Sequence, residues 1–217
     1  GHYHHETRRG LAMTPIKLTT RTLTTHNGHR WVLGEWHTAN GAGIKACSDG
    51  VIHYYDDVRL AVLFNPIHAA IDDPRAFEVE IDQELGHDGL KGWCKRLRLV
   101  REIPVPIITT EQQVVFAIRC ALLVYHAPDF TAWAERWLNG TDRSYPSAAA
   151  AHAACAACAV DAADAACAAA AADAACAVDA ACAVAAAYAA ACAAAAGRPQ
   201  KTRHQFLALV DEVMPWT

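Results

Sequence analysis

The residue types that could do chemistry are concentrated in residues 47–55, which contain a cysteine, a serine, an aspartate, a histidine and two tyrosines. A strand that follows the turn at Gly50 presents alternate side chains to opposite faces, so His53 and Tyr55 share one face and Tyr54 lies on the other. Two interpretations stay open. The histidine is a structural residue between aromatic neighbours, or it is the polar anchor of a small-molecule pocket.

A second group of charged residues lies in residues 75–82, where apolar and acidic residues alternate as in a half-buried strand. Residues 93–104 carry the complementary pattern of leucines and arginines. The acidic and basic faces predict cross-strand ion pairs, and the alternative is a catalytic carboxylate or an anion-binding surface. With Glu80 as that carboxylate, the candidate catalytic residues are His53, Tyr55 and Glu80.

Metal and nucleophile chemistry have weaker support. His152, Cys155 and Cys158 are spaced three residues apart, but on a helix they spread over about 120° of arc, which is a poor half of a tetrahedral site. No metal site is therefore predicted. Cys47 has no residue close in the sequence that would orient a base for it. Glycine-rich phosphate loops are absent from the sequence, and no cofactor is predicted.

The elements that must position these residues are strands before residue 105 and helices after it. Strands are predicted at residues 16–25, 29–39, 44–47, 51–55, 75–82 and 93–104, with a hairpin turn at Asn27-Gly28. A first helix is predicted after a cap at Asp56 or Asp57, and it ends at Asn65-Pro66. A second is predicted at 110–126 after a capping box from Thr110 to Gln113. Two more are predicted at 129–139 with Asp129 as cap and at 204–213 with Thr202 as cap. The predicted fold class is α+β, in which helices 110–126 and 129–139 cover one small antiparallel sheet from residues 14–105.

The alanine run at residues 148–196 has no glycine or proline and is bounded by Pro146 and Gly197. Alanine is the best intrinsic helix former, so the run predicts one long helix or two or three stacked helices. Most of its cysteines and aspartates fall on a three-residue grid, which winds around a helix and leaves no side clearly polar. We expect the run to pack closely against a partner, and the chain to form a homo-oligomer through residues 148–196. The cysteines of the run are expected to be reduced and buried: Cys155, Cys158, Cys167, Cys176, Cys182 and Cys192.

Composition limits the class of protein. The chain has 217 residues and a formal net charge of −4, which predicts neither nucleic acid nor an anionic membrane as a partner. The alanine run carries four aspartates and is not predicted to span a bilayer. The polar, histidine-rich residues 1–12 predict a disordered leader, not a signal peptide. Nine cysteines, six of them in the run, fit free thiols in a cytoplasm.

Three segments before residue 145 carry a resemblance to known proteins. They are residues 45–53, residues 60–69, and residues 88–91 leading to residues 96–104. These segments resemble a family of uncharacterised proteins carried by phages and bacteria. Relatives in that family also tend to carry an alanine-rich tail. The resemblance extends from Met13 to about Ser144 and implies a location in the cytoplasm, that of the host if a phage encodes the chain. It implies no particular activity.

A weaker similarity is to ADP-ribosyltransferases, which share an order of elements with this chain. The matching segments are Lys17-Leu18, residues 50–55, Leu60-Ala61 and residues 77–80. This resemblance implies that His53, Tyr54 and Glu80 handle a nicotinamide ribose. The usual spacing of these three residue types in that family is not reproduced here.

Four parts and two functions are predicted. The parts are a leader at 1–12, an α+β head at 13–144, an alanine-rich helical region at 145–197 and a short helix at 198–217. The first function is that of a phage or bacterial accessory protein that self-associates through the alanine-rich region. The second is that of an enzyme that binds a nucleotide or an NAD-derived ligand in a pocket lined by His53, Tyr55 and Glu80. The sequence alone does not decide whether the chain is an enzyme.

Overall fold

The computed structural model describes residues 14–25, 28–157, 171–172, 175, 180–195 and 199–215. The strands are β1 (Ile16–Thr19), β2 (His37–Thr38), β3 (Ile52–Tyr54), β4 (Arg75–Ile81), β5 (Glu84–His87), β6 (Gly92–Cys94) and β7 (Arg96–Ile103). The helices are α1 (Val58–His68), α2 (Thr110–Leu122), α3 (Pro128–Leu138), α4 (Tyr145–Ala157), α6 (Ala180–Ala195) and α7 (Pro199–Val213). The predicted α+β class is confirmed, and the predicted leader at residues 1–12 lies outside the described residues.

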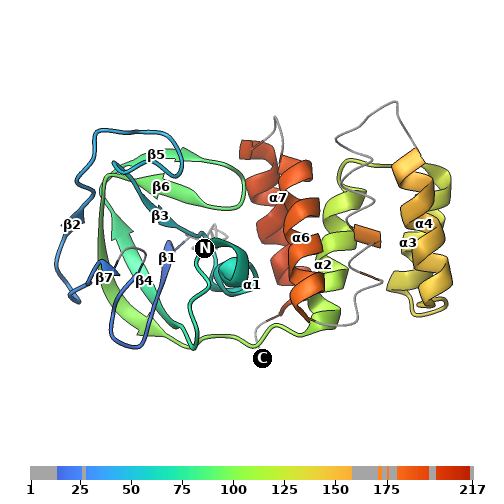
Figure 1. Ribbon diagram of the computed structural model, residues 1–217, viewed down its shortest axis with the longest axis horizontal. Coiled ribbons are helices and arrows are strands. Elements are labelled where there is room, and N and C mark those ends of the chain that lie inside the picture. The colour runs from blue at the N-terminus through green and yellow to red at the C-terminus, as the bar shows by residue number, and fades with distance from the viewer. Residues whose placement is uncertain are drawn as a thin grey trace, which may run out of the picture.

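The strands form two antiparallel sheets where the sequence predicted one. One sheet has the order β1-β4-β7-β2 and the other has the order β3-β6-β5 (Figure 1). The predicted single strand at 93–104 is interrupted at Lys95, so that Cys94 pairs with β3 and β5 while Arg96 begins the strand that pairs with β4. Backbone hydrogen bonds between Ile16 and Tyr55 join the two sheets.

The alternating pattern of β4 and β7 is explained by their pairing. Phe77 and Val79 are buried with Leu97 and Leu99 in one apolar cluster. On the other face, glutamates of β4 pair with arginines of β7: Glu78 with Arg101 and Glu80 with Arg98. The predicted cross-strand ion pairs are confirmed.

Several predicted strands are shorter than their β-branched composition indicated. Strand β1 ends at Thr19, because the Thr20 hydroxyl accepts a hydrogen bond from the backbone N–H of Thr24 and closes a turn. Of the segment at 29–39 only β2 is a strand, and residues 44–47 form turns. At the predicted hairpin turn, Asn27 lies outside the described residues, while Gly28 has a φ of 69°.

Helix α1 begins where it was predicted and continues further. The Asp57 carboxylate accepts a hydrogen bond from the N–H of Arg59 and caps the helix. The predicted end at Asn65-Pro66 is wrong, since Pro66 lies inside the helix near its last turn. The Asn65 side chain accepts a hydrogen bond from the N–H of Ile71 and donates one to its C=O. These two bonds hold the segment that follows the helix.

The later helices also differ in detail at their starts. The capping box of α2 uses Thr109 and Gln112, one residue before the predicted pair. Helix α3 begins at Pro128 without a side-chain cap, and Asp129 lies in its first turn. Helix α7 begins at Pro199, so Thr202 is a buried helical residue and not a cap.

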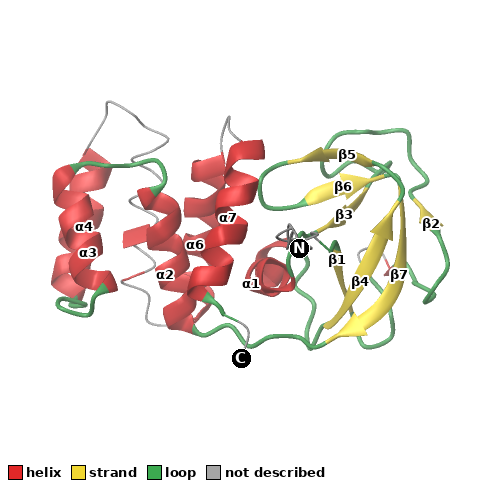
Figure 2. Cartoon of the chain, turned by 180° about the vertical axis from the view of Figure 1, so that it is seen from behind, coloured by secondary structure: helices red, strands yellow, loops and turns green. Residues whose placement is uncertain are grey.

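The helices form layers beside the sheets, in an order that differs from the prediction. Helix α1 packs against β1 and α6, and α6 packs against α2 and α7 (Figure 2). Helices α2 and α3, predicted to cover the sheet, pack instead against other helices, with α3 next to α4. The helix closest to the sheets is therefore α1, whose buried Leu60, Leu63 and Phe64 belong to the main core.

The alanine run is not one straight helix. Its described ends, α4 and α6, lie in different layers of the stack (Figure 1). Four alanines of α6 are fully buried within the chain: Ala187, Ala190, Ala191 and Ala194. Small side chains allow the helix backbones to approach closely.

Among the cysteines predicted to be reduced and buried, Cys192 is a free, half-buried thiol. The other five predictions fall outside what the structure describes: Cys158, Cys167 and Cys176, and the side chains of Cys155 and Cys182. Within the described ranges, no helix combines the length and the hydropathy needed to cross a membrane.

Candidate functional site

A pocket of ≈ 620 Å³ opens beside the junction of the two sheets. Its walls come from β1, from the loop between β2 and β3, from β3 and from α1. The polar and aromatic lining residues include Lys17, Trp31, Cys47, Asp49, His53, Tyr55, Asn65, His68 and Lys91. The volume is in the range that accepts a small organic ligand.

The structure brings His53 and Tyr55 together and directs Tyr54 elsewhere, as the strand alternation predicted. His53 and Tyr55 line the pocket. Tyr54 is buried in the apolar cluster formed by β4 and β7, and its hydroxyl donates a hydrogen bond to Glu84. Burial raises the pKa of Tyr55 well above its usual value, so the phenol is neutral, and it is hydrogen-bonded to Nδ1 of His68.

Glu80, the third predicted site residue, is not brought to the pocket. It lies on the solvent face of β4, where its carboxylate is 2.5 Å from the Arg98 guanidinium. Half of its side chain is exposed. The three residues implied by the resemblance to ADP-ribosyltransferases, His53, Tyr54 and Glu80, thus lie in three different places.

Two lysines supply positive charge at the pocket. Nζ of Lys17 donates a hydrogen bond to the carbonyl of His53 and lies 5.7 Å from the ring centroid of Trp31. Burial lowers the pKa of Lys17 to about 8. Within the described part of the chain, neither Lys17 nor Lys91 has a carboxylate partner within ion-pair distance.

Two of the histidines that line the pocket, His53 and His68, are neutral near pH 7. Burial, with the positive charge of Lys91 next in importance, lowers the pKa of each to about 4. Nε2 of His53 accepts a hydrogen bond from the backbone N–H of Cys47 and lies 3.9 Å from its Sγ. The sequence shows no nearby residue that would orient a base for Cys47, and the structure places the imidazole of His53 beside its thiol. Because Nε2 already accepts the amide hydrogen, it is not aimed at the thiol.

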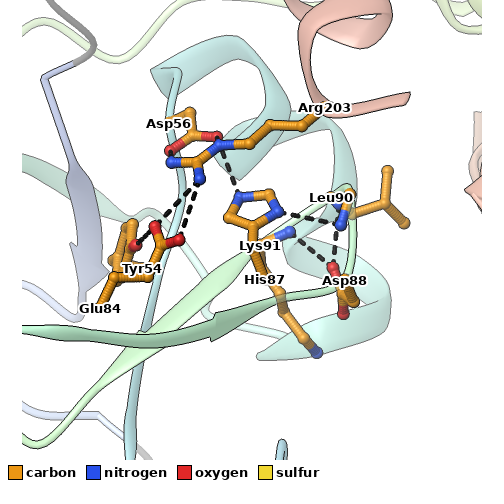
Figure 3. Close-up of polar contacts among 9 residues, drawn as sticks. Tyr54, Asp56, Glu84, His87, Asp88, Leu90, Lys91 and Arg203 are labelled. Atoms are coloured by element: carbon orange, nitrogen blue, oxygen red, sulfur yellow. Dashed lines mark hydrogen bonds and ion pairs between the residues drawn. The ribbon is translucent and has the colours of Figure 1, made fainter. Parts of the chain in front are cut away.

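Behind the pocket wall lies a buried polar cluster that the sequence analysis missed (Figure 3). Asp56 accepts two hydrogen bonds from Arg203 of α7, at 2.7 Å from Nε and 2.8 Å from Nη2. Nε2 of His87 lies 2.9 Å from the same carboxylate. Arg203 also donates to Glu84, which holds the hydroxyl of Tyr54. We refer to Tyr54, Asp56, Glu84, His87 and Arg203 as the Arg203 cluster.

The Asp56 and Arg203 side chains of the Arg203 cluster stay ionised. Burial alone would raise the pKa of Asp56, but the close contacts with His87 and Arg203 outweigh it and lower the pKa below its usual value. Desolvation would lower the pKa of Arg203, and its two carboxylate partners raise it instead. The signal missed in the sequence was Asp56 itself, which had been considered only as a helix cap.

No grouping of three or more metal-ligating side chains occurs among the residues that the structure describes. The side chains of His152 and Cys155, and the whole of Cys158, lie outside those residues. Comparison with known proteins found no match to a protein-family model, to a curated protein or to a solved structure. Both resemblances stated from the sequence therefore stay predictions.

Proposed function

We propose that the chain binds a small anionic ligand with a planar ring, of the nucleotide class, in the pocket between the two sheets. The observation that carries this proposal is the pair of lysines, Lys17 and Lys91, that line one pocket without a carboxylate partner among the described residues. A buried ammonium group without a counter-ion is costly, and an anionic ligand removes that cost.

The remaining lining fits such a ligand. Trp31 and Tyr55 provide aromatic surface for a planar ring. His53 is neutral, so it adds a polar group to the pocket without adding a charge. Asp49 is the acidic residue of the lining, and one of its oxygens already accepts a hydrogen bond from the N–H of Gly43. The charged side chains among the described lining residues are thus two lysines and one aspartate, a set with a net positive charge.

The proposal is one of binding and does not extend to group transfer. An ADP-ribosyl transfer through Glu80 would need that carboxylate at the ligand, and Glu80 is paired with Arg98 on another face. Self-association through residues 148–196 stays a prediction, since the described alanines of α6 are buried against helices of the same chain.

The test is isothermal titration of the intact chain with ADP, with NAD and with uncharged adenosine. We expect ADP to bind at least tenfold more tightly than adenosine, which is about 1.4 kcal/mol. Lys17→Met and Lys91→Met should each weaken ADP binding about tenfold. Lys201→Met, at an exposed position on α7, and Glu80→Gln are the matched controls and should leave it unchanged.

Two outcomes would overturn the proposal. One is a folded chain that binds neither ADP nor NAD at millimolar concentration. The other is a chain that binds adenosine as tightly as ADP, with no loss in either lysine variant. A loss in Glu80→Gln as large as that in the lysine variants would instead support the site predicted from the sequence.

A further inference from the structure

We propose that Arg203 is a positioning residue for the pocket, so that helix α7 determines how tightly the ligand is held. This inference rests on the proposed function. Arg203 does not line the pocket, and it acts through the two wall segments that present Tyr55 and Lys91. The argument depends on the contacts of the Arg203 cluster and on the chain that leaves it.

A single guanidinium group holds two separate segments of the sheet region. Arg203 reaches from α7 to Asp56, directly after β3, and to Glu84, at the start of β5 (Figure 3). Arg203 is 9% exposed and Asp56 is 6% exposed, so water has little access to the bonds between them, whereas the Glu84 side chain is 33% exposed. A two-pronged arginine–carboxylate pair fixes orientation as well as distance. A helix 147 residues further along the chain than Asp56 thereby joins the β3 and β5 sides of the β3-β6-β5 sheet, in which both strands are paired with β6.

The first wall segment follows directly from Asp56. Tyr55 precedes it, lines the pocket, and is held on its other side by backbone hydrogen bonds to Ile16. A shift of the Asp56 carboxylate therefore moves the backbone that carries the Tyr55 ring.

The second wall segment follows from His87, whose Nε2 lies against Asp56. Nδ1 of His87 accepts a hydrogen bond from the N–H of Gly89, which opens the turn between β5 and β6. The Asp88 carboxylate accepts from the N–H groups of Leu90 and Lys91 and completes that turn. Gly89 has a φ of 98°, a conformation that favours glycine. The turn that presents Lys91 is thus fastened to Asp56 through His87.

Lys17 provides an internal reference, because it reaches the same pocket from β1 and, in the described structure, its ammonium group is not hydrogen-bonded to a side chain of the Arg203 cluster. Its ammonium group is held by the carbonyl of His53. A loss at Arg203 should therefore be coupled to Lys91 and not to Lys17. A role of Arg203 in folding alone would weaken the contributions of both lysines equally.

The experiment is a pair of double-mutant cycles on ADP binding, measured by calorimetry well below the unfolding midpoint of every variant. Arg203→Lys keeps the charge but loses the two-pronged geometry. We expect Arg203→Lys to weaken ADP binding about tenfold in the natural background and in Lys17→Met, but less than threefold in Lys91→Met. Arg119→Lys is the control, since Arg119 pairs with Glu212 of α7 at a partly exposed site remote from the pocket wall.

A second measurement needs no ligand. Hydrogen exchange of the Gly89, Leu90 and Lys91 amides should be faster in Arg203→Lys than in Arg119→Lys, since these amides donate the hydrogen bonds that hold the turn. If the unmodified chain does not bind ADP, the proposed function fails and exchange alone decides the role of Arg203. Unchanged exchange at these amides overturns the positioning role. Equal coupling of Arg203 to both lysines, in a chain that binds ADP, also overturns it.

Discussion

At the scale of single residues, burial has shifted the pKa values of several groups that line the pocket. Lys17 is the clearest, because burial lowers its pKa to about 8, close to the pH of ordinary buffers. Its charge is therefore lost at a pH where an exposed lysine keeps it. Any function that depends on the ammonium group of Lys17 should depend on pH in that range.

We predict that ADP affinity falls as the pH rises from 7.5 to 9.5. Lys17 is protonated below its folded pKa of about 8 and attracts the phosphates, and above that pH the attraction is lost. Arginine stays protonated throughout, so Lys17→Arg should abolish the dependence. Calorimetric titration at four pH values checks this, and an equally steep fall in Lys17→Arg would contradict it.

The pocket histidines predict a second pH effect, on stability. The folded pKa values of His53 and His68 are about 4, below the ordinary value of 6.5, so the unfolded chain binds more protons between these limits. The free energy of unfolding should be highest above pH 6.5 and fall as the pH is lowered to 4. Urea unfolding at pH 7, 6, 5 and 4.5 measures it.

His68→Gln should reduce the slope of that fall, since it removes one of the buried groups that titrate differently on unfolding. His126→Gln is the control at an exposed position of the loop between α2 and α3. If the histidines are not the cause, the slope will be the same in the His68 variant as in the unmodified chain.

At the scale of elements, local sequence signals specify the starts of α1, α2 and α3 to within about a residue, and they specify the end of α1, the start of α7 and the strand pairing less well. The capping box of α2 illustrates this, because Thr109 and Thr110 are neighbours and each has a glutamine three residues later. The structure uses Thr109 with Gln112, since Gln113 is buried in the core. Burial of Gln113, which the sequence pattern does not show, decides between two equivalent motifs.

We predict that Thr109→Ala lowers the free energy of unfolding by about 1 kcal/mol through loss of the cap. Thr109→Ser keeps the hydroxyl and should restore most of it. Thr110→Ala, one residue inside the helix, should change stability by less than about 0.5 kcal/mol. Chemical denaturation of the three variants distinguishes the two possible capping boxes. A larger loss of stability in Thr110→Ala than in Thr109→Ala would place the cap at Thr110.

The alternation of β4 and β7 and their ion pairs could be predicted because they follow from a period of two along single segments. The break at Lys95 could not, because the adjacent polar residues Lys95 and Arg96 show only that the alternation is interrupted, and pairing partners distant in sequence are what separate β6 from β7. The same holds for the candidate site. His53 and Tyr55 were found from local spacing, whereas Lys17 and Lys91 join them only through the fold.

At the scale of the whole molecule, the described helices of the alanine run are part of the chain's own core. Tyr188 of α6 packs edge-on against Phe64 and His68 of α1, with ring centroids 5.6 and 4.8 Å apart. Helix α6 therefore contributes to the layer that supports the pocket as well as to the helix stack. The self-association predicted from the sequence needs a surface that these contacts leave open.

We predict from the sequence that the chain assembles through residues 148–196 at micromolar concentration. Sedimentation analysis of the intact chain measures the mass directly. A mass equal to that of one chain across the concentration range would contradict the prediction. Such a result would leave the pocket and its proposed ligand unaffected, since the described pocket lining comes from residues 17–91.

The contact between Asp56 and Arg203 also has a consequence for the order in which the protein is made. The two residues are 147 positions apart, so a ribosome adding about 5–20 residues per second needs roughly 7–30 s to deliver the arginine after the aspartate. During that interval the nascent sheets hold a carboxylate pair, Asp56 and Glu84, that still lacks its cation. Their final packing has to wait for α7 to emerge, and the growing chain stays open to chaperones and proteases during that interval.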